Sequence, residues 1–316
     1  MQFRLNNFSA DEHSVCNLAF MNILQAIILG IVQGLTEFIP ISSTAHLVFA
    51  SRWTNVYNGN AEQITATMAI IQLGTLAAVF VYFAADILNI SAAFTRDHWN
   101  LIFNKRKIRF SGTNGLRPVW MSEEAFLGWL IIIGSIPIGT IGFIFKEMIE
   151  GKDTKNLWII ASMMIAVALG LALAEAVGSQ RKELRQFGLL DSIIVGFAQV
   201  LALIPGASRS GSTIMGGLFA GQKREAAARF SFLLMIPAIT ASGLLELREA
   251  VQILSKDDII ALAIGTIVAG IVGYLSIWFL LAYLRKRSTA VFIIYRIIVG
   301  AIILLLLYRG VLSPQI

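Results

Sequence analysis

The sequence predicts an all-α polytopic membrane protein with six transmembrane helices and two re-entrant helical hairpins in inverted-topology repeats. Three observations support this prediction. Of the 316 residues, 57% are apolar and 14% are charged, whereas soluble domains average roughly 45–50% and about 25%. Six apolar stretches are long enough to span a bilayer. Two further apolar stretches are interrupted by polar residues.

The composition excludes other classes of protein. A soluble enzyme of this length needs more charged surface than the sequence supplies, and the mean hydropathy is +0.75. Because Cys16 is the single cysteine, a disulfide scaffold is excluded. The net charge of +6 does not indicate a nucleic-acid partner, because membrane proteins collect basic residues in their cytoplasmic loops.

Residues 1–20 are polar and lack the basic-then-apolar layout of a signal peptide. We interpret them as an N-terminal extension of unknown role. Met21 begins the apolar pattern, and residues 21–316 are expected to form a single membrane domain.

The apolar stretches follow in order along the chain. A helix that crosses about 30 Å of hydrocarbon needs roughly 20 apolar residues. Each interrupted stretch is better explained by two short helices joined by a polar break, which is tolerated at membrane depth only inside protein or beside a wet cavity. The predicted spans are about 66–87, 125–145, 157–177, 229–247, 259–284 and 290–308, and the predicted re-entrant segments are about 22–50 and 189–221.

The basic residues predict an orientation. The loop 88–124 is rich in arginine and lysine and is expected to be cytoplasmic, which places most of the other basic residues inside as well. Three predicted spans separate the two re-entrant segments. Because three is odd, the segments approach the middle of the membrane from opposite faces, the first from outside.

The two breaks also resemble each other in sequence. Aligned on proline, IPISS (39–43) falls on IPGAS (204–208), 165 residues later, which pairs Ser43 with Ser208. Inverted repeats whose broken helices meet near the midplane are a transporter architecture. The pattern therefore predicts a site where the two breaks meet.

The first break carries groups suited to catalysis. Gln33 and Glu37 lie four residues apart and share a helix face. Gln33 could instead serve an interhelical hydrogen bond, whereas a carboxylate at membrane depth indicates a functional site. Ser42 or Ser43 could cap the next helix. His46 lies three residues after Ser43, so both should project from nearly the same side.

The second break, PGASRSGST (205–213), surrounds Arg209 with small and hydroxyl residues. Backbone N–H groups in such a segment can form an anion-binding nest, and a helix N-terminus adds a favourable dipole. Arginine supplies a fork that matches phosphate oxygens. We expect Gly206, Ser208, Ser210 and Thr213 to bind phosphate with Arg209. Together, the two breaks hold the groups needed for phosphoryl transfer.

A second arginine lies inside the last predicted span. Arg296 could pair with Glu175 or Asp191, or extend to the membrane surface. We expect its role to be structural.

Two stretches, QGLTEFIPISSTAHL (33–47) and PGASRSGST (205–213), resemble the two signatures of the undecaprenyl-pyrophosphate phosphatase family, the bacitracin-resistance proteins. The resemblance covers residues 21–308. It implies six spanning helices with two re-entrant hairpins, and hydrolysis of undecaprenyl diphosphate to the monophosphate and phosphate, which recycles the lipid carrier of peptidoglycan synthesis. The site residues it implies are Gln33, Glu37, Ser42, Ser43, His46, Ser208, Arg209, Ser210 and Thr213.

The resemblance also implies partners and a location. We expect a polyprenyl diphosphate substrate, contact with membrane lipid, no nucleic acid, and a site that faces the outer side of the bacterial plasma membrane. A divalent cation, Mg²⁺ or Ca²⁺, could be held by Glu37, and no organic cofactor is expected. The family's first signature begins with Glu or Gln, and Gln33 is a neutral ligand. A homodimer is left open.

Several alternatives stay open at this point. The catalytic residues are expected to be Glu37, Ser43, His46 and Arg209, with Ser43 favoured as the nucleophile and His46 or Glu37 as its base. His46 or water could attack instead. A polyprenyl-phosphate flippase is the first alternative function. An ion channel is the second, although single Glu37 and Arg209 side chains do not form a selectivity ring.

Overall fold

The computed structural model describes residues 20–103, 117–118, 120–145 and 156–315. These residues form helices joined by turns. The main helices are α1 (Ile23–Phe38), α2 (Ser43–Thr54), α3 (Ala61–Tyr82), α4 (Ala84–Phe103), α5 (Glu123–Ile144), α7 (Leu157–Val177), α8 (Leu189–Val200), α9 (Arg209–Phe219), α10 (Arg224–Ile253), α11 (Ile259–Leu284) and α12 (Ala290–Tyr308). Short 3-10 turns are η1 (Val56–Gly59), η2 (Leu184–Gln186), η3 (Leu201–Leu203) and η4 (Lys256–Asp258).

Among the described residues, six helices are long and apolar enough to cross a membrane: α3, α5, α7, α10, α11 and α12. The predicted number of spans is therefore confirmed, and the chain is an integral membrane protein. Lipid-facing side chains explain the many exposed large apolar residues on these helices, among them Ile267 and Ile302.

The region after the first span was predicted wrongly. The span was expected at 66–87 and a loop at 88–124, but α3 ends at Tyr82 and α4 follows immediately. Ile90 and Phe94 of α4 pack beside Gly128 of α5. The helix was missed because its charged and amide residues interrupt the apolar pattern. Residues 104–116 and 119 lie outside the described residues.

Both interrupted segments are pairs of short helices, as predicted. Helix α1 ends at Ile39, whose ψ is 131°, and the helical segment α8–η3 ends at Ile204, whose ψ is 123°. Each of these residues precedes a proline, and the proline ring disfavours the α conformation of the residue before it. Local sterics therefore favour the end of both helices here, although Pro137 and Pro237 lie inside α5 and α10 and do not end them. Helices α2 and α9 begin a few residues later.

Small residues allow the short helices to pack closely on spans. A Cβ atom on Gly30 or Gly34 of α1 would meet the α11 backbone at Gly265 or Ala269, and a Cβ on Gly196 of α8 would meet the α5 backbone at Gly134. Membrane helices approach closely where such residues face each other. In both the α1–α11 contact and the α8–α5 contact, glycines therefore let the two helix backbones approach closely.

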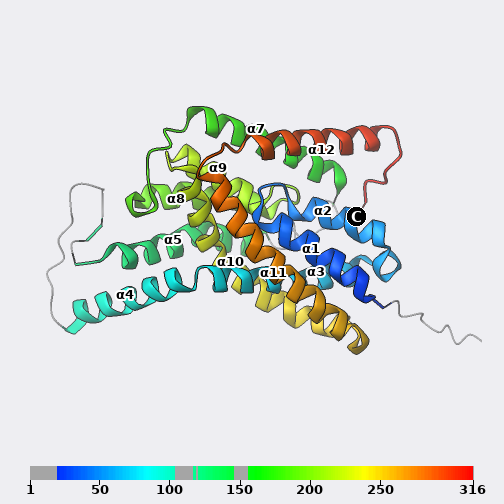
Figure 1. Cartoon of the computed structure of the whole chain (residues 1–316), viewed down its shortest axis with the longest axis horizontal. Coiled ribbons are helices and arrows are strands. Elements are labelled where there is room, and N and C mark those ends of the chain that lie inside the picture. Colours follow the sequence, from blue (N-terminus) through cyan, green and yellow to red (C-terminus); the bar gives the residue numbers. More distant parts are fainter. Residues whose placement is uncertain (1–19, 104–116, 119, 146–155, 316) are drawn as a thin grey trace, which may run out of the picture.

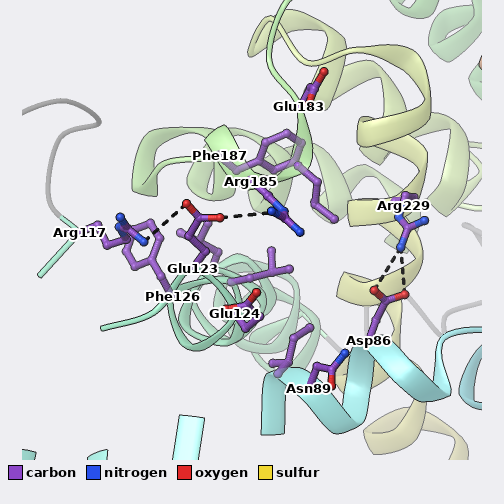
Figure 2. Close-up of a pocket in the computed structure, with 14 residues that line it drawn as sticks. Asp86, Asn89, Arg117, Glu123, Glu124, Phe126, Glu183, Arg185, Phe187 and Arg229 are labelled. Atoms are coloured by element: carbon purple, nitrogen blue, oxygen red, sulfur yellow. Dashed lines mark hydrogen bonds and ion pairs between the residues drawn. The ribbon is translucent and has the colours of Figure 1, made fainter. Parts of the chain in front are cut away.

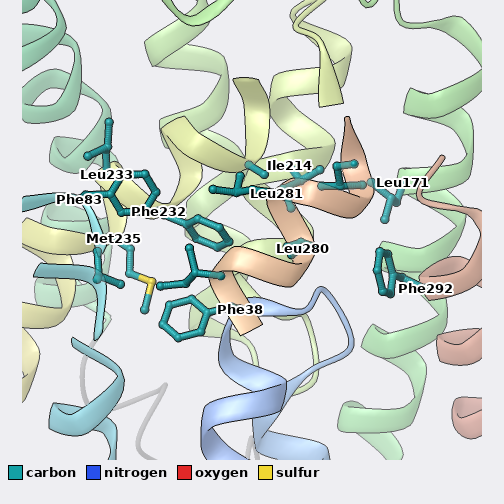
Figure 3. Close-up of a cluster of buried hydrophobic side chains, with 14 of the residues drawn as sticks. Phe38, Phe83, Leu171, Ile214, Phe232, Leu233, Met235, Leu280, Leu281 and Phe292 are labelled. Atoms are coloured by element: carbon teal, nitrogen blue, oxygen red, sulfur yellow. The ribbon is translucent and has the colours of Figure 1, made fainter. Parts of the chain in front are cut away.

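A cluster of buried apolar side chains joins the two halves of the chain (Figure 3). Phe38, at the end of α1, packs edge-on against Phe232 of α10 with ring centroids 5.4 Å apart. Phe83 lies on the other side of Phe232, at 6.2 Å. This cluster fixes the end of α1, and with it the start of the first break, against α10.

The two pairs of short helices lie toward opposite ends of the long axis (Figure 1). Helices α1 and α2, in blue, lie at the right of the view, and α8 and α9, in green and yellow-green, lie left of its centre. The breaks of the two pairs come together near the middle of the molecule, as the contacts described next establish.

Candidate functional site

Ser42 and Ser208 are the N-caps of the second helix in each pair. Ser42 has φ 81° and ψ 96°, its side chain accepts from the N–H of Ala45, and α2 follows. Ser208 has φ 67° and ψ 117°, its side chain accepts from the N–H of Gly211, and α9 follows. A positive φ is uncommon outside glycine. The two breaks therefore share a specific backbone geometry as well as a sequence pattern.

This geometry corrects the alignment of the two breaks. Alignment on proline paired Ser43 with Ser208, but the residue equivalent to Ser208 is Ser42. The second break has one more residue between its proline and its cap, because a glycine and an alanine stand where the first break has Ile41. As a result, Ser43 and Arg209 occupy the same position, the first residue of the helix that follows the cap.

Glu37 is the centre of a small polar cluster. Its Oε2 accepts a hydrogen bond from Ser43 Oγ at 3.0 Å and from Gln33 Nε2 at 3.3 Å. Its Oε1 lies 3.7 Å from Nη1 of Arg209. Gln33 also donates to Thr75 Oγ1 of α3 at 3.5 Å. The structure thus brings together the carboxylate and hydroxyl of the first break and the guanidinium of the second.

Arg209 keeps unused hydrogen-bonding capacity. Within the described part of the chain, its Nε and Nη1 atoms are buried and have no hydrogen-bond partner. Buried donors without partners are costly, because they lose their bonds to water. The ion pair with Glu37 is too long to satisfy them, so this guanidinium is suited to bind an anion that enters the site.

Arg296 holds the two breaks together. It is fully buried, and it donates to five backbone carbonyls. One of them, Pro40, belongs to the first break at 3.3 Å, and two belong to the second, Gly206 at 3.1 Å and Ala207 at 3.0 Å. The other two are Met163 and Met164 of α7.

The expected carboxylate partners of Arg296 were wrong, although its role is structural as expected. Glu175 pairs with Arg224 and accepts from Thr289, and Asp191 pairs with Lys182. The carbonyls at the breaks point inward because the chain turns there without helical partners for them. No pattern in the sequence indicates which carbonyls these are.

His46 lies apart from the Glu37 cluster. Its Nδ1 is 2.7 Å from the carbonyl oxygen of Ser42, and its Nε2 is 2.7 Å from the hydroxyl of Tyr295 on α12. Of the two residues expected as the base for Ser43, Glu37 is hydrogen-bonded to it and His46 is not. The two side chains leave α2 toward different neighbours, Ser43 toward α1 and His46 toward α12.

The remaining predicted residues shape the second break. Ser210 Oγ lies 3.2 Å from Ser208 Oγ. Thr213 donates to the carbonyl of Arg209 at 2.7 Å and lies 2.5 Å from the hydroxyl of Ser231 on α10, so it ties α9 to α10. Gly206 has φ 93° and packs so closely on the backbone of Ile160 that a Cβ would not fit.

An apolar groove of about 340 Å³ adjoins the first break. Its walls come from α1, α2 and α12, and His46 and Tyr295 supply most of its polar character. The groove is lined by Val32, Leu35, Thr36, Ile39, Ile41, Ala45, His46, Phe49, Tyr295 and Val299. It offers an apolar chain a place next to the polar cluster.

A second cavity, of about 360 Å³, lies away from both breaks and is lined by charged residues (Figure 2). Arg229 points at Asp86, with 2.9 Å between the closest atoms, and Glu123 lies between Arg117 and Arg185. Each of these arginines lies within 4.0 Å of a carboxylate, as Arg209 does, but Arg209 also has buried Nε and Nη1 atoms without a hydrogen-bond partner in the described part of the chain.

The donor set around Glu37 suits a cation that is shared with a substrate. Among the described residues, no three histidine, cysteine or acidic side chains gather to hold a metal ion. Mg²⁺ is often bound through one or two carboxylates together with substrate phosphates. Glu37 fits that mode as a single carboxylate and does not form a complete cage, and it is the amide nitrogen of Gln33 that faces it.

Two residues close to the site were missed or undervalued in the sequence. Arg296 gave a signal, an arginine inside an apolar span. Tyr295 gave none, because a tyrosine in a membrane helix is ordinary and its contact with His46 joins residues 249 positions apart.

Comparison with known proteins agrees with this geometry. A family model described as bacitracin resistance protein BacA matches residues 26–302. The chain is 47% identical over 290 residues to an undecaprenyl-diphosphatase from Syntrophobacter fumaroxidans, covering 92% of this chain and 99% of that protein. It is 45% identical over 303 residues to one from Chlorobaculum tepidum, with coverages of 93% and 100%. A third, from Myxococcus xanthus, is 43% identical over 295 residues, with coverages of 93% and 92%.

Proposed function

The chain belongs to the family of bacitracin resistance protein BacA, and we propose that it hydrolyses undecaprenyl diphosphate to undecaprenyl phosphate and inorganic phosphate. This reaction recycles the lipid carrier of peptidoglycan synthesis and confers resistance to bacitracin. The enzyme is then a membrane-bound hydrolase of a phosphoric anhydride, and its substrate is a membrane lipid.

One observation carries this proposal beyond the relatives' names. Among the described residues, Nε and Nη1 of Arg209 have no hydrogen-bond partner, and they lie beside Glu37. Glu37 already accepts a hydrogen bond from Ser43 Oγ. An arginine fork binds phosphate oxygens and stabilises the charge that develops on them during transfer. The apolar groove beside the first break can take the first prenyl units, so head group and tail both have a place.

Ser43 is the nucleophile that this geometry favours. Its Oγ attacks the terminal phosphorus while its proton passes to Glu37, which lies 3.0 Å away. The bond from phosphorus to the bridging oxygen breaks, and undecaprenyl phosphate leaves. Water then attacks the phosphorus of the phosphoserine and the bond from phosphorus to Ser43 Oγ breaks. Oγ takes back the proton from Glu37, and the oxygen and protons of the water leave with inorganic phosphate. Arg209 holds the terminal phosphate throughout.

Two other routes remain as alternatives from the sequence. His46 could attack phosphorus, or water could attack directly with Glu37 as base. Labelled substrate and an acid quench would discriminate, because phosphohistidine is acid-labile whereas phosphoserine is acid-stable. A label trapped on His46 would overturn the assignment to Ser43.

A divalent cation, Mg²⁺ or Ca²⁺, is proposed as a cofactor that Glu37 would hold together with the diphosphate, and Gln33 would join it only with its amide turned, since its Nε2 faces Glu37. Such an ion neutralises charge on the phosphate oxygens. Gln33 is a neutral ligand, so the protein's share in binding is small and depends on Glu37.

We further propose that α1–α2 and α8–α9 are re-entrant hairpins of an inverted repeat. The similar caps at Ser42 and Ser208 support this, as do the matching contacts of α1 with α11 and of α8 with α5. The proposed site faces the outer side of the plasma membrane, because the basic loops point inward. A homodimer stays a prediction, to be checked by the mass of the protein in detergent.

Phosphate release tests the function. The purified full chain in detergent, with a short-chain prenyl diphosphate and Mg²⁺, should release inorganic phosphate in the absence of any gradient or second compartment. A flippase would release none under these conditions, because lipid transfer between leaflets leaves the anhydride intact. The absence of phosphate release from folded protein would therefore overturn the proposed hydrolase.

A further inference from the structure

The imidazole of His46 is held at both nitrogens. A carbonyl oxygen can only accept, so the 2.7 Å contact with Ser42 requires the proton on Nδ1. In the neutral ring, the lone pair is then on Nε2, and it accepts from the Tyr295 hydroxyl at 2.7 Å. The two rings also stack, with centroids 5.7 Å apart and planes 14° apart. Tautomer and orientation are thus both fixed.

Tyr295 is itself held rigidly. The next residue, Arg296, is anchored to the carbonyls of both breaks. Successive residues on a helix point about 100° apart. On one turn of α12, Arg296 therefore hydrogen-bonds to both breaks while Tyr295 contacts the imidazole of His46. The phenol ring is 39% exposed and lies in the wall of the apolar groove.

From this geometry we propose that Tyr295 is a positioning residue for the hydrolase. It donates a hydrogen bond to Nε2 of His46, whose Nδ1–H tautomer the Ser42 carbonyl fixes, and so holds the imidazole ring in place at the wall of the apolar groove. The proposal rests on the proposed function for its effect on rate, and on the structure alone for its effect on the imidazole.

Tyr295→Phe keeps the stacked ring and removes only the hydroxyl. We expect kcat to fall about three- to tenfold, the worth of one neutral hydrogen bond, with KM little changed. Tyr308→Phe, on the same helix but 82% exposed, is the matched control. In a His46→Gln background, Tyr295→Phe should have no further effect, because the group it acts through is gone.

A spectroscopic measurement tests the same proposal without turnover. The chain has 3 histidines, so ¹⁵N labelling of histidine gives few signals, and His46→Gln identifies the relevant pair. The wild type should show the Nδ1–H tautomer with a hydrogen-bonded Nε2, and Tyr295→Phe should keep this tautomer but move the Nε2 resonance toward that of a lone pair without a donor. An Nε2–H tautomer in the wild type, or a spectrum unchanged by Tyr295→Phe, overturns the proposal.

The activity assay and the ¹⁵N spectra distinguish a failure of the proposed function from a failure of the proposed role of Tyr295. If the wild type releases no phosphate, the proposed function falls, while the ¹⁵N spectra still decide whether Tyr295 donates to Nε2 of His46. If the wild type is active but Tyr295→Phe matches it in kcat, the role of Tyr295 in the reaction is wrong.

Discussion

Ser42 and Ser208 adopt the same left-handed backbone conformation at the same place in two separate helix pairs, with φ of 81° and 67°. After each cap, the first residue of the next helix points at Glu37, which belongs to the first break. Those residues are Ser43 and Arg209. The same cap conformation, at two positions, therefore brings a hydroxyl and a guanidinium to a single carboxylate, Glu37.

Replacing Arg209 by lysine should severely impair turnover although the charge is retained. Lysine is a point donor and cannot contact two phosphate oxygens in a fixed fork. Losing one such contact in a transition state costs roughly 10²–10³ in rate. Phosphate release by Arg209→Lys, compared with the exposed control Arg309→Lys, measures this. Near-normal turnover of Arg209→Lys would remove this residue from phosphate binding.

Ser43 and Glu37 should act as one unit. We expect Ser43→Ala and Glu37→Gln each to lower kcat by roughly 10²–10⁴, the usual contribution of a general base and its partner. The double variant should be little worse than either single one. Thr65→Ala, an exposed hydroxyl on α3, serves as the control. Fully multiplicative losses would show that the hydrogen bond between Ser43 and Glu37 has no role in the reaction.

The role of Glu37 toward a cation can be separated from its role as a base. If Glu37 is mainly a metal ligand, Glu37→Gln should recover part of its rate as Mg²⁺ is raised, because an amide oxygen binds the cation more weakly. If it is the base, the defect should persist at every concentration. We expect the defect to persist at every concentration, since Glu37 already accepts a hydrogen bond from Ser43 Oγ. A titration of phosphate release with Mg²⁺, after removal of metal with a chelator, gives the answer.

Arg296→Met should destabilise the fold. It would leave the carbonyls of Pro40, Gly206 and Ala207 buried without donors, and each such group costs about 1–3 kcal/mol. The midpoint of thermal unfolding in detergent should fall by several degrees, whereas the exposed control Arg309→Met should leave it unchanged. Arg296→Lys should lie between the two, because an ammonium reaches fewer of the carbonyls. An unchanged midpoint for Arg296→Met would contradict the clamp.

The site should open toward the outer side of the membrane. After Cys16 is replaced by serine, single cysteines at Glu62 and at Lys286 can be probed in intact cells with an impermeant thiol reagent. Glu62, at the start of α3, should be labelled, and Lys286, after α11, should be labelled only when the cells are opened. The reverse pattern would invert the orientation.

The sequence by itself determined the class of fold and the main reactive groups. A membrane span needs a long, uninterrupted apolar helix, so the six spans could be counted from the lengths of the apolar stretches in the sequence. The prolines at 40 and 205 disfavour the helical conformation of the residue before each, and polar residues follow them, so the two breaks could also be predicted. Charged groups are rare at membrane depth, and this made Glu37 and Arg209 stand out.

Only the tertiary structure decided how these groups are paired. Ser43 contacts Glu37 and not His46, and Arg296 is bound by backbone carbonyls and not by carboxylates. Both outcomes depend on where a chain points after a break, which is set by the φ of Ser42 and Ser208 and by one extra residue in the second break. The contact between His46 and Tyr295 depends on the packing of α12 against α2, residues far apart in the sequence. Side-chain periodicity specifies which face of a helix is apolar, but the partner of a polar group is fixed only when the helices are packed.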